Sequence, residues 1–243
     1  ACSEPESLEI KTYIETQKPK AVVVWYSAAG GVFASSCQNG FLPEMVIKGN
    51  EIKPEVGGGM CQIGTTLFRM AMNAGMPITE RRNHSLVVGY YADPVNGNPG
   101  TDATLYEPLV DFKFLNDTGN YLLLQAEIDY KKQQLTFTLW GKSDGRKGWY
   151  THPTVSRWIP AGEPKDIEVD NLKPGEKKCQ NAFRGAVASF TYTRVTPSGE
   201  KIDRVFDSYY RSLPKICLVG KTAATGPPTS TPAGTEPLPL ELN

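Results

Sequence analysis

A cysteine that follows three glycines is the residue of this chain with the clearest chemical potential. The run GGGMC, residues 57–61, leads into a segment of helical periodicity, so Cys61 is expected in the first helical turn. There, unpaired N–H groups and the positive end of the helix dipole favour the thiolate, which is the nucleophilic form of cysteine. The same N–H groups can hold an oxyanion, and glycine lets a substrate approach the backbone closely. We therefore expect Cys61 to act as a nucleophile, with Gly58 and Gly59 facing the substrate.

A cysteine nucleophile needs a base, and the chain has only two histidines, His84 and His152. His84 lies 23 residues after Cys61, and Asp102 lies 18 residues after His84. Each precedes a segment rich in β-branched and aromatic residues, so a helix and two strands can bring all three to one end of a sheet. In that arrangement His84 accepts the thiol proton and Asp102 orients the imidazole, whereas His152 is expected to be structural or exposed.

Four polar side chains near these residues are candidates for binding a substrate. Arg81 and Arg82 precede the histidine and can hold a carboxylate, while Gln62 and Ser85 directly follow the cysteine and the histidine. Each assignment has an alternative that the residues leave open. Cys61 can be an inert core thiol, and Asp102 can simply close a turn, in which case Asp111 would orient the histidine instead. The two arginines can be a solvated pair, and Gln62 can belong to the helix start.

The composition argues against several classes of function. The 243 residues include 26 Lys and Arg against 26 Asp and Glu, and this net charge of zero argues against a dedicated nucleic-acid binder. No stretch approaches the roughly 20 apolar residues that a transmembrane helix needs. The five cysteines form no CxxC pair and have no histidine at zinc-finger spacing, so no metal site is expected. A cysteine nucleophile also needs no organic cofactor.

The odd number of cysteines leaves at least one thiol free within the monomer. In an exported protein two disulfides can form, and we expect Cys179 with Cys217 and Cys2 with Cys37, which leaves Cys61 unpaired. The Ala-Cys pair at the start is also typical of a lipoprotein processing junction. A lipid anchor at Cys2 is therefore the alternative for that residue.

The spacing of apolar residues predicts one main helix over about 61–74, which Gly75 and Pro77 end. Runs of β-branched and aromatic residues predict strands at 21–26, 41–47, 86–91, 103–106, 111–115, 121–128 and 135–140, the last three as a meander. We therefore predict an α+β fold, in which a mostly antiparallel β sheet packs on the main helix and a small all-β module follows.

A polar, glycine-containing break at 141–150 indicates a domain boundary near residue 150. The first domain is then 1–150, and residues 151–220, with their short strands and turn pairs, form the small all-β module. Residues 221–243 are rich in Pro, Thr and Gly and lack aromatic residues, so a flexible tail is expected there.

The stretch from Gly40 to Trp140 resembles a VanW domain. The resemblance is carried by GFLPEMVIKGNEIKPEVGGGMCQIGTTLFRMAMNAGMPITERRNHS and by DATLYEPLVDFKFLNDT. These contain the glycine run, the Cys-Gln and Thr-Thr pairs, the Arg-x-x-His-Ser unit and the Asp-Ala-Thr unit. Residues 157–220 resemble a G5-like module through DNLKPGEKKCQ, ASFTYTRVTPSGEKIDRVFDSYYR and PKICLVG.

Some members of the VanW family are L,D-transpeptidases, which join peptidoglycan stem peptides with a cysteine nucleophile. The resemblance implies Cys61 as nucleophile and His84 as its base. It also implies stem peptides as substrates and an extracytoplasmic location, in the cell envelope or at the cell surface. Two alternatives remain: a non-catalytic envelope scaffold that binds wall polymer or other envelope proteins, and a cysteine peptidase that hydrolyses stem peptides.

Overall fold

The computed structural model describes residues 21–24, 43–48, 51–56, 59–106, 110–132 and 134–221. The one α-helix within these ranges, α1, spans Met60–Asn73, which confirms the helix expected over about 61–74. It buries the face that carries Leu67, Phe68, Ala71 and Met72, because apolar residues three and four positions apart lie on one side of a helix. No helix in the described ranges is long and apolar enough to cross a membrane.

Strands make up most of the remaining regular structure. In chain order they are β1 (Ala21–Val24), β2 (Pro43–Lys48), β3 (Glu51–Val56), β4 (Ile78–Glu80), β5 (Lys113–Asn116), β6 (Leu122–Asp129), β7 (Gln134–Gly141), β8 (Lys147–Tyr150), β9 (Thr154–Ile159), β10 (Lys165–Val169), β11 (Lys177–Gln180), β12 (Gly185–Val195), β13 (Lys201–Tyr210) and β14 (Ile216–Gly220).

These strands belong to five sheets rather than one. The sheets are β1-β5-β4, β10-β14-β11, β2-β3, β6-β7, and β13-β12-β8 with β9 also paired to β12. Pairing is antiparallel in the described strands except between β10 and β14. The predicted fold class is therefore wrong: the described chain is a set of mostly antiparallel sheets with one short helix, not a sheet packed on a main helix. Local composition indicates where strands lie, but strand pairing depends on tertiary context.

The structure also corrects several expected elements. Residues 86–91 form a loop that ends in a short 3-10 helix, η2 (Gly89–Tyr91). Residues 103–106 form no strand, apart from one bridge between Tyr106 and Val110. The expected meander is not formed, because β5 pairs with β1 and β4 while β6 pairs with β7. The expected break at 141–150 contains strand β8.

One hydrophobic core joins the helix to both halves of the chain. Phe68 of α1 packs edge-on against Phe112 and Phe206, with ring centroids 5.6 and 5.5 Å apart. Phe190 of β12 stacks on Phe206 of β13 at 5.3 Å, and both belong to the same buried cluster as the helix. The domain boundary near residue 150 stays a prediction. Strands on both sides of that position nevertheless share this core.

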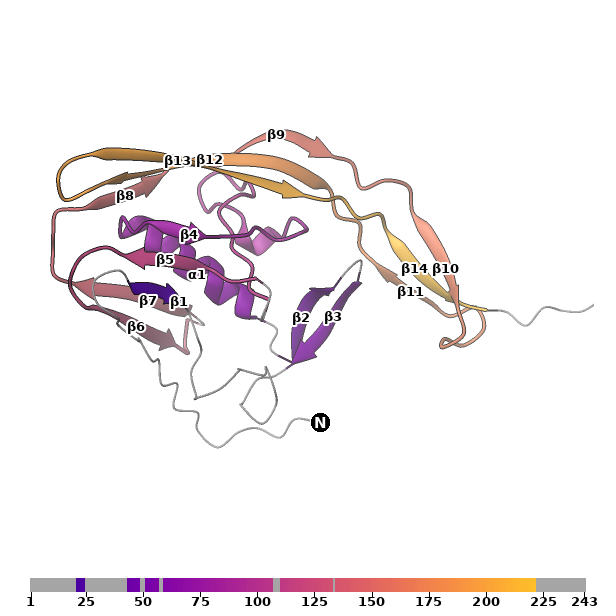
Figure 1. Ribbon diagram of the computed structural model, residues 1–243. Helices are drawn as coiled ribbons and strands as arrows, with labels where there is room; N and C mark the ends of the chain where they lie inside the picture. The colour runs from indigo at the N-terminus through magenta and orange to yellow at the C-terminus, as the bar shows by residue number, and fades with distance from the viewer. Residues whose placement is uncertain are drawn as a thin grey trace, which may run out of the picture.

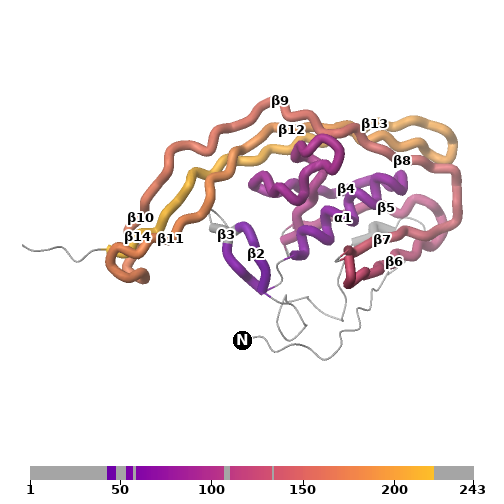
Figure 2. The backbone as a smooth tube through the Cα atoms, turned by 180° about the vertical axis from the view of Figure 1, so that it is seen from behind, coloured from indigo at the N-terminus to yellow at the C-terminus, as the bar shows by residue number. Residues whose placement is uncertain are grey.

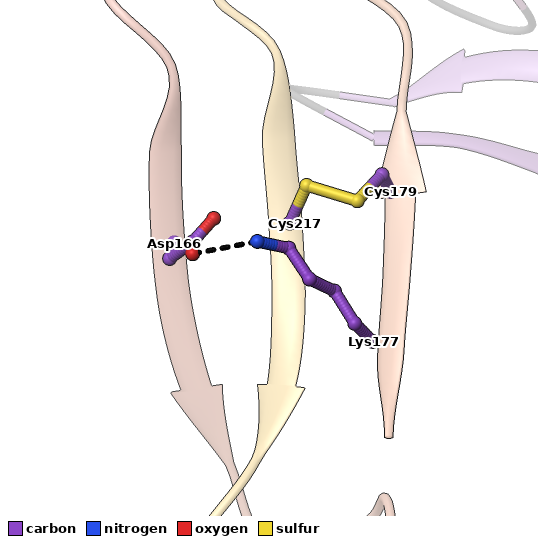
Figure 3. Close-up of a disulfide and its surroundings, with 4 residues drawn as sticks. All are labelled: Asp166, Lys177, Cys179 and Cys217. Carbon is purple, nitrogen blue, oxygen red and sulfur yellow. Dashed lines mark hydrogen bonds and ion pairs between the residues drawn. A yellow bond between two sulfur atoms is a disulfide. The ribbon is translucent and has the colours of Figure 1, made fainter. Parts of the chain in front are cut away.

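Strands β12 and β13 run over the helix and then lead away to the small sheet β10-β14-β11 (Figures 1 and 2). That sheet contains the disulfide between Cys179 of β11 and Cys217 of β14, the pair expected from the sequence (Figure 3). Lys177 of β11 also forms an ion pair with Asp166 of β10, at 2.7 Å. The disulfide joins the neighbouring strands β11 and β14, and the ion pair joins the two outer strands β11 and β10 across β14.

Several expectations concern residues outside the described ranges. They are the bridge between Cys2 and Cys37, the lipid anchor at Cys2, the substrate-facing Gly58, and the flexible tail beyond residue 221. These expectations stay predictions.

Candidate active site

Gly59 leads the chain into the first turn of α1. It is the N-cap residue, and its φ of 88° is a left-handed conformation that glycine adopts without strain. Cys61 is the second residue of the helix, and the first turn carries no acidic residue. The positive end of the helix dipole therefore acts on the sulfur without a compensating carboxylate in the same turn.

The half-buried sulfur of Cys61 faces the loop at residues 101–105. Its Sγ lies 3.3 Å from Thr104 Oγ1 and 3.4 Å from the carbonyl oxygen of Leu105. In the thiol form the S–H group can donate to either oxygen. In the thiolate form the sulfur can accept from the threonine hydroxyl, so the contact with Thr104 serves both protonation states.

The helix can approach this loop closely because of two small residues. A Cβ at Gly64 would lie 2.7 Å from Leu105 Cγ, so only glycine fits there without displacing the leucine. The Thr65 hydroxyl donates to the carbonyl oxygen of Ala103 and accepts from its N–H, each at 3.1 Å. These contacts hold the thiol-bearing turn beside the segment that carries the carboxylate.

His84 and Asp102 form a buried pair next to the thiol. The ring Nδ1 and the backbone N–H of His84 both donate to Asp102 Oδ2, at 2.6 and 2.7 Å. The two side chains are 6% and 3% exposed, so water competes little for these bonds. Because Asp102 holds Nδ1, Nε2 is the ring nitrogen that remains for Cys61.

The three groups act on one another's protonation. Burial raises the pKa of the Cys61 thiol, but the interaction with His84 and the hydrogen bonds to the sulfur outweigh it, so this pKa lies below its ordinary value. Burial lowers the pKa of His84, but the hydrogen bond to Asp102 and the interaction with Cys61 raise it to about 9. Burial raises the pKa of Asp102, and the hydrogen bond from His84 and the charge of Arg81 bring it below its ordinary value. The lowered pKa of Cys61 and the raised pKa of His84 both favour a thiolate beside an imidazolium, relative to the free side chains.

An aromatic ring packs against the imidazole of His84. Tyr91 stacks on His84, with ring centroids 4.7 Å apart. Tyr90 packs edge-on against Tyr91 at 4.4 Å and is itself exposed. The buried Nε2 of His84 has no other hydrogen-bond partner among the described residues, and Cys61 and His84 act on each other's pKa. Nε2 is therefore the ring atom able to exchange a proton with Cys61.

Arg81 does not face a substrate, contrary to the expectation from the sequence. Its side chain is 2% exposed, and its guanidinium donates to the carbonyl oxygens of Gly100 and Asp102, each at 2.7 Å, and to Ser208 Oγ at 2.9 Å. The guanidinium carbon also lies 5.3 Å from the centroid of the Phe68 ring. A buried guanidinium must use its donors inside the protein. Arg81 therefore supports Asp102 rather than binding a ligand.

The other substrate-binding candidates lie at the surface. Three of them, Gln62, Arg82 and Ser85, are exposed, and Gly59 is exposed too. Arg82 is next to the site, because its carbonyl oxygen accepts from the N–H of Thr104 at 2.8 Å. Substrate binding by these residues stays a prediction.

The carboxylate beside His84 is Asp102 and not its rival Asp111. The Asp111 side chain accepts from the N–H of Phe112 at 2.8 Å, and burial raises its pKa. His152 lies elsewhere and is 52% exposed. The described part of the chain brings together no group of three or more His, Cys, Asp and Glu side chains able to hold a metal ion.

Two supporting residues were not predicted from the sequence. The hydroxyl of Tyr210 donates to Asp102 Oδ1, and Ser208 accepts from Arg81. These contacts join residues 108 and 127 positions apart in the chain. No local pattern could therefore have indicated them.

This arrangement is able to carry out nucleophilic attack on a carbonyl carbon. The thiolate of Cys61 is the nucleophile, and Nε2 of His84 carries the proton. The N–H of Cys61 at the helix start can donate to an oxyanion.

Comparison with known proteins finds a family model whose match covers this site. Residues 24–140 match the family model described as VanW like protein. The uncharacterized protein YoaR of Bacillus subtilis (strain 168) is 36% identical over 83 residues, which are 34% of this chain and 25% of that protein. The vancomycin B-type resistance protein VanW of Enterococcus faecalis (strain ATCC 700802 / V583) is 34% identical over 77 residues, which are 31% of this chain and 27% of that protein.

The chain spans about a quarter of the length of these curated relatives. The resemblance of residues 157–220 to a G5-like module stays a prediction. The family match includes Cys61, His84 and Asp102 but ends before Tyr210. The chain therefore contains a VanW-like domain over residues 24–140.

Proposed function

We propose that this chain is a cell-envelope enzyme that joins peptidoglycan stem peptides by cysteine acyl transfer, as an L,D-transpeptidase does. The observation that carries the proposal is the buried arrangement of Cys61, His84 and Asp102. In it the pKa of Cys61 is lowered and that of His84 is raised, which favours a nucleophilic thiolate. The VanW-like match supports this substrate class, because some members of the family are L,D-transpeptidases. The name of the enterococcal relative, which concerns vancomycin resistance, is consistent with it.

In the first half of the reaction, the Cys61 thiolate attacks a donor tetrapeptide at the carbonyl carbon of its third residue, which is bonded to the terminal D-alanine. The carbonyl electrons move to the oxygen, and N–H groups at the start of α1 hold the resulting oxyanion. When the oxyanion collapses, the C–N bond breaks and His84 gives its proton to the leaving amine. A thioester on Cys61, a neutral imidazole and free D-alanine result.

In the second half, the side-chain amine of an acceptor peptide attacks the thioester. His84 takes a proton from that amine, the C–S bond breaks, and the thiolate returns as the new amide forms. Asp102 keeps the ring oriented and stabilises its charged form throughout. The exposed Arg82 is the side chain that we expect to bind a stem-peptide carboxylate, beside Gln62 and Ser85.

Incubation of the full chain with purified disaccharide tetrapeptides, followed by chromatography and mass spectrometry, tests the proposal. We expect crosslinked dimers and one D-alanine released for each dimer. The Cys61→Ala and His84→Gln variants should form neither product. His152→Gln is the matched control for the second variant and should retain full activity, because His152 lies elsewhere and is half exposed.

The other outcomes identify the alternatives. Release of D-alanine without dimers would show a peptidase that uses water as the acceptor. Absence of both products, together with a Cys61 thiol that reacts like an ordinary cysteine, would contradict the enzyme and favour a scaffold. Peptide mapping of the alkylated protein distinguishes Cys61 from the other cysteines.

A further inference from the structure

The two oxygens of the Asp102 carboxylate have separate partners. Oδ2 accepts both bonds from His84, at 2.6 and 2.7 Å. Oδ1 accepts from the Tyr210 hydroxyl, and one nitrogen of Arg81 lies 3.4 Å from it. A donor on Oδ1 limits rotation of the carboxylate about its Cβ–Cγ bond. It therefore determines how Oδ2 meets the imidazole.

Tyr210 is the last residue of β13, and the end of this strand is hydrogen-bonded to the segment that contains His84. Residues 83–85 and 209–211 lie side by side, with a hydrogen bond on each side of the central pair. In one bond, Asn83 Nδ2 donates to the carbonyl oxygen of Tyr209 at 2.8 Å. In the other, the N–H of Arg211 donates to the carbonyl oxygen of Ser85 at 2.9 Å. The backbone that presents the imidazole and the backbone that presents the tyrosine hydroxyl are thus joined directly.

Strand β13 is also fixed by contacts away from the site. It pairs with β12 along its whole length, from Lys201 opposite Val195 to Tyr210 opposite Ala186. Phe206 of the same strand lies in the main core. The hydroxyl of Tyr210 is consequently delivered from a rigid element, which is what accurate placement of a supporting group needs.

Burial keeps Tyr210 in its donating form. The residue is 1% exposed. Burial and the nearby charge of Asp102 raise the pKa of Tyr210 far above its ordinary value, so the hydroxyl stays protonated at every working pH. A hydroxyl that cannot ionise is a permanent donor to the carboxylate.

We propose that Tyr210 is a positioning residue of this site, whose hydroxyl holds Asp102 in the orientation that serves His84. The role rests on the proposed function, since it affects catalysis only if Cys61 and His84 react as described. Strand β13, which lies beyond the family-matched residues 24–140, thereby completes the site of the VanW-like domain.

The charged and titratable groups around Asp102 determine what a test can measure. His84 contacts one carboxylate oxygen, and Arg81 and Tyr210 contact the other. Farther out are the groups that act on these three, namely Cys61 and Tyr91 at His84, and Arg204 at Arg81. Changing Tyr210 to Phe removes one donor and keeps the ring. The ionised Asp102 is then less stable, and the imidazolium and thiolate that depend on it are less stable too.

The test is the pH dependence of Cys61 alkylation by iodoacetamide, measured by peptide mass spectrometry on the full chain. In Tyr210→Phe we expect the acid limb of this profile to move up by about half a pH unit to one pH unit, as for the loss of one hydrogen bond. On the acid side of the limb, alkylation then slows by roughly threefold to tenfold.

Tyr192→Phe is the matched control. Tyr192 is also buried, on the neighbouring strand β12, and its hydroxyl donates to the carbonyl oxygen of Met76 at 2.9 Å. This variant should lose a comparable amount of thermal stability while its alkylation profile stays that of the wild type. Tyr209→Phe, at an exposed neighbour of Tyr210, should change neither quantity.

The results separate a failure of this inference from a failure of the proposed function. A folded Tyr210→Phe protein whose profile coincides with the wild type, or moves to lower pH, overturns the inference. If wild-type Cys61 reacts as an ordinary thiol, the proposed function fails, and NMR titration of His84 decides the inference instead. Its midpoint, assigned with the help of His152→Gln, should fall from about 9 in Tyr210→Phe; an unchanged midpoint would refute the positioning role.

Discussion

Two His–Asp pairs in this molecule share residue types and differ in their surroundings. His84 and Asp102 are 6% and 3% exposed, and their closest nitrogen and oxygen are 2.6 Å apart. His152 and Asp93 are 52% and 1% exposed, at 3.1 Å. The first pair also acts on the thiol of Cys61. A histidine beside an aspartate is therefore not enough to mark the candidate site, which differs in its buried imidazole and in the thiol that acts on it.

The second pair belongs to a turn. Asp93 Oδ1 accepts from the N–H groups two and three residues farther along, at 3.0 and 3.2 Å. The side-chain amides of Asn96 and Asn98 donate to the carbonyl oxygen of Pro153, at 2.8 and 2.9 Å. These bonds close the turn and attach it to the segment that carries His152. The Asp93 carboxylate is used as a turn acceptor, as aspartate often is in loops.

Removal of each imidazole should have the largest effect and the sharpest contrast. In His84→Ala the thiol loses the group that lowers its pKa, and burial then raises that pKa, so Cys61 alkylation at neutral pH should slow about a hundredfold. His152→Ala should react within about twofold of the wild type. Stopped-flow alkylation with peptide mapping measures both rates. Equal losses in the two variants would remove the basis of the comparison.

Neutralising each carboxylate should give the next largest difference. Asp102→Asn keeps the size of the side chain but loses the charge that stabilises the imidazolium, so dimer formation should fall roughly tenfold to a hundredfold. Asp93→Asn should form dimers at close to the wild-type rate, because its pair has no thiol. Initial rates with muropeptide substrate test this contrast. A fully active Asp102→Asn enzyme would show that His84 needs no carboxylate.

The pH dependence of stability should carry a signature of the Cys61–His84 pair. The pKa of His84 is raised from 6.5 to about 9, so its contribution to stability is complete below pH 6.5 and is lost as the pH rises through about 9. The pKa of Cys61 is lowered from 9.0, so its contribution is complete above pH 9.0 and is lost as the pH falls through the lowered value.

The two contributions have opposite slopes, so they cancel at pH values above both 6.5 and the lowered pKa of Cys61 and below about 9, where the folded chain holds the thiolate–imidazolium pair. In that window the unfolded chain carries its proton on the sulfur, and the folded chain carries it on the imidazole. The difference in unfolding free energy between wild type and a Cys61→Ser, His84→Gln double variant should therefore be flat there. Urea unfolding across the window measures it, and a steady slope would argue against the ion pair.

Disrupting the turn that Asp93 closes should have the smallest effect on the reactivity of Cys61. Asp93→Ala removes the acceptor for two backbone N–H groups, so the free energy of unfolding should fall by about 1–2 kcal/mol. The rate of Cys61 alkylation should stay within about twofold of the wild type. Thermal unfolding and alkylation of the same sample check both. A large loss of thiol reactivity would mean that the two His–Asp pairs are coupled.

Local patterns predicted the helix and the three side chains, Cys61, His84 and Asp102, that the structure brings together. The glycine run and the apolar period of residues 61–74 lie within a few turns of Cys61, so they indicate its place directly. His84 and Asp102 were selected by order and spacing, although both lie on loops rather than at strand ends. Arg81 shows the limit of such reasoning. Its place near the histidine is visible in the sequence, but its hydrogen bond to Ser208, 127 positions away, is not.

By itself, the sequence determined the residue types of the site, the helix that carries the thiol and the cysteines available for a disulfide. Only the tertiary structure decided how the described strands divide into five sheets, the choice of Asp102 over Asp111 and the support that Tyr210 gives. The reason is one of range. Helical periodicity and the helix dipole act over a few residues, whereas burial and hydrogen bonding of a carboxylate are set by segments as far apart as Asp102 and Tyr210, 108 positions along the chain.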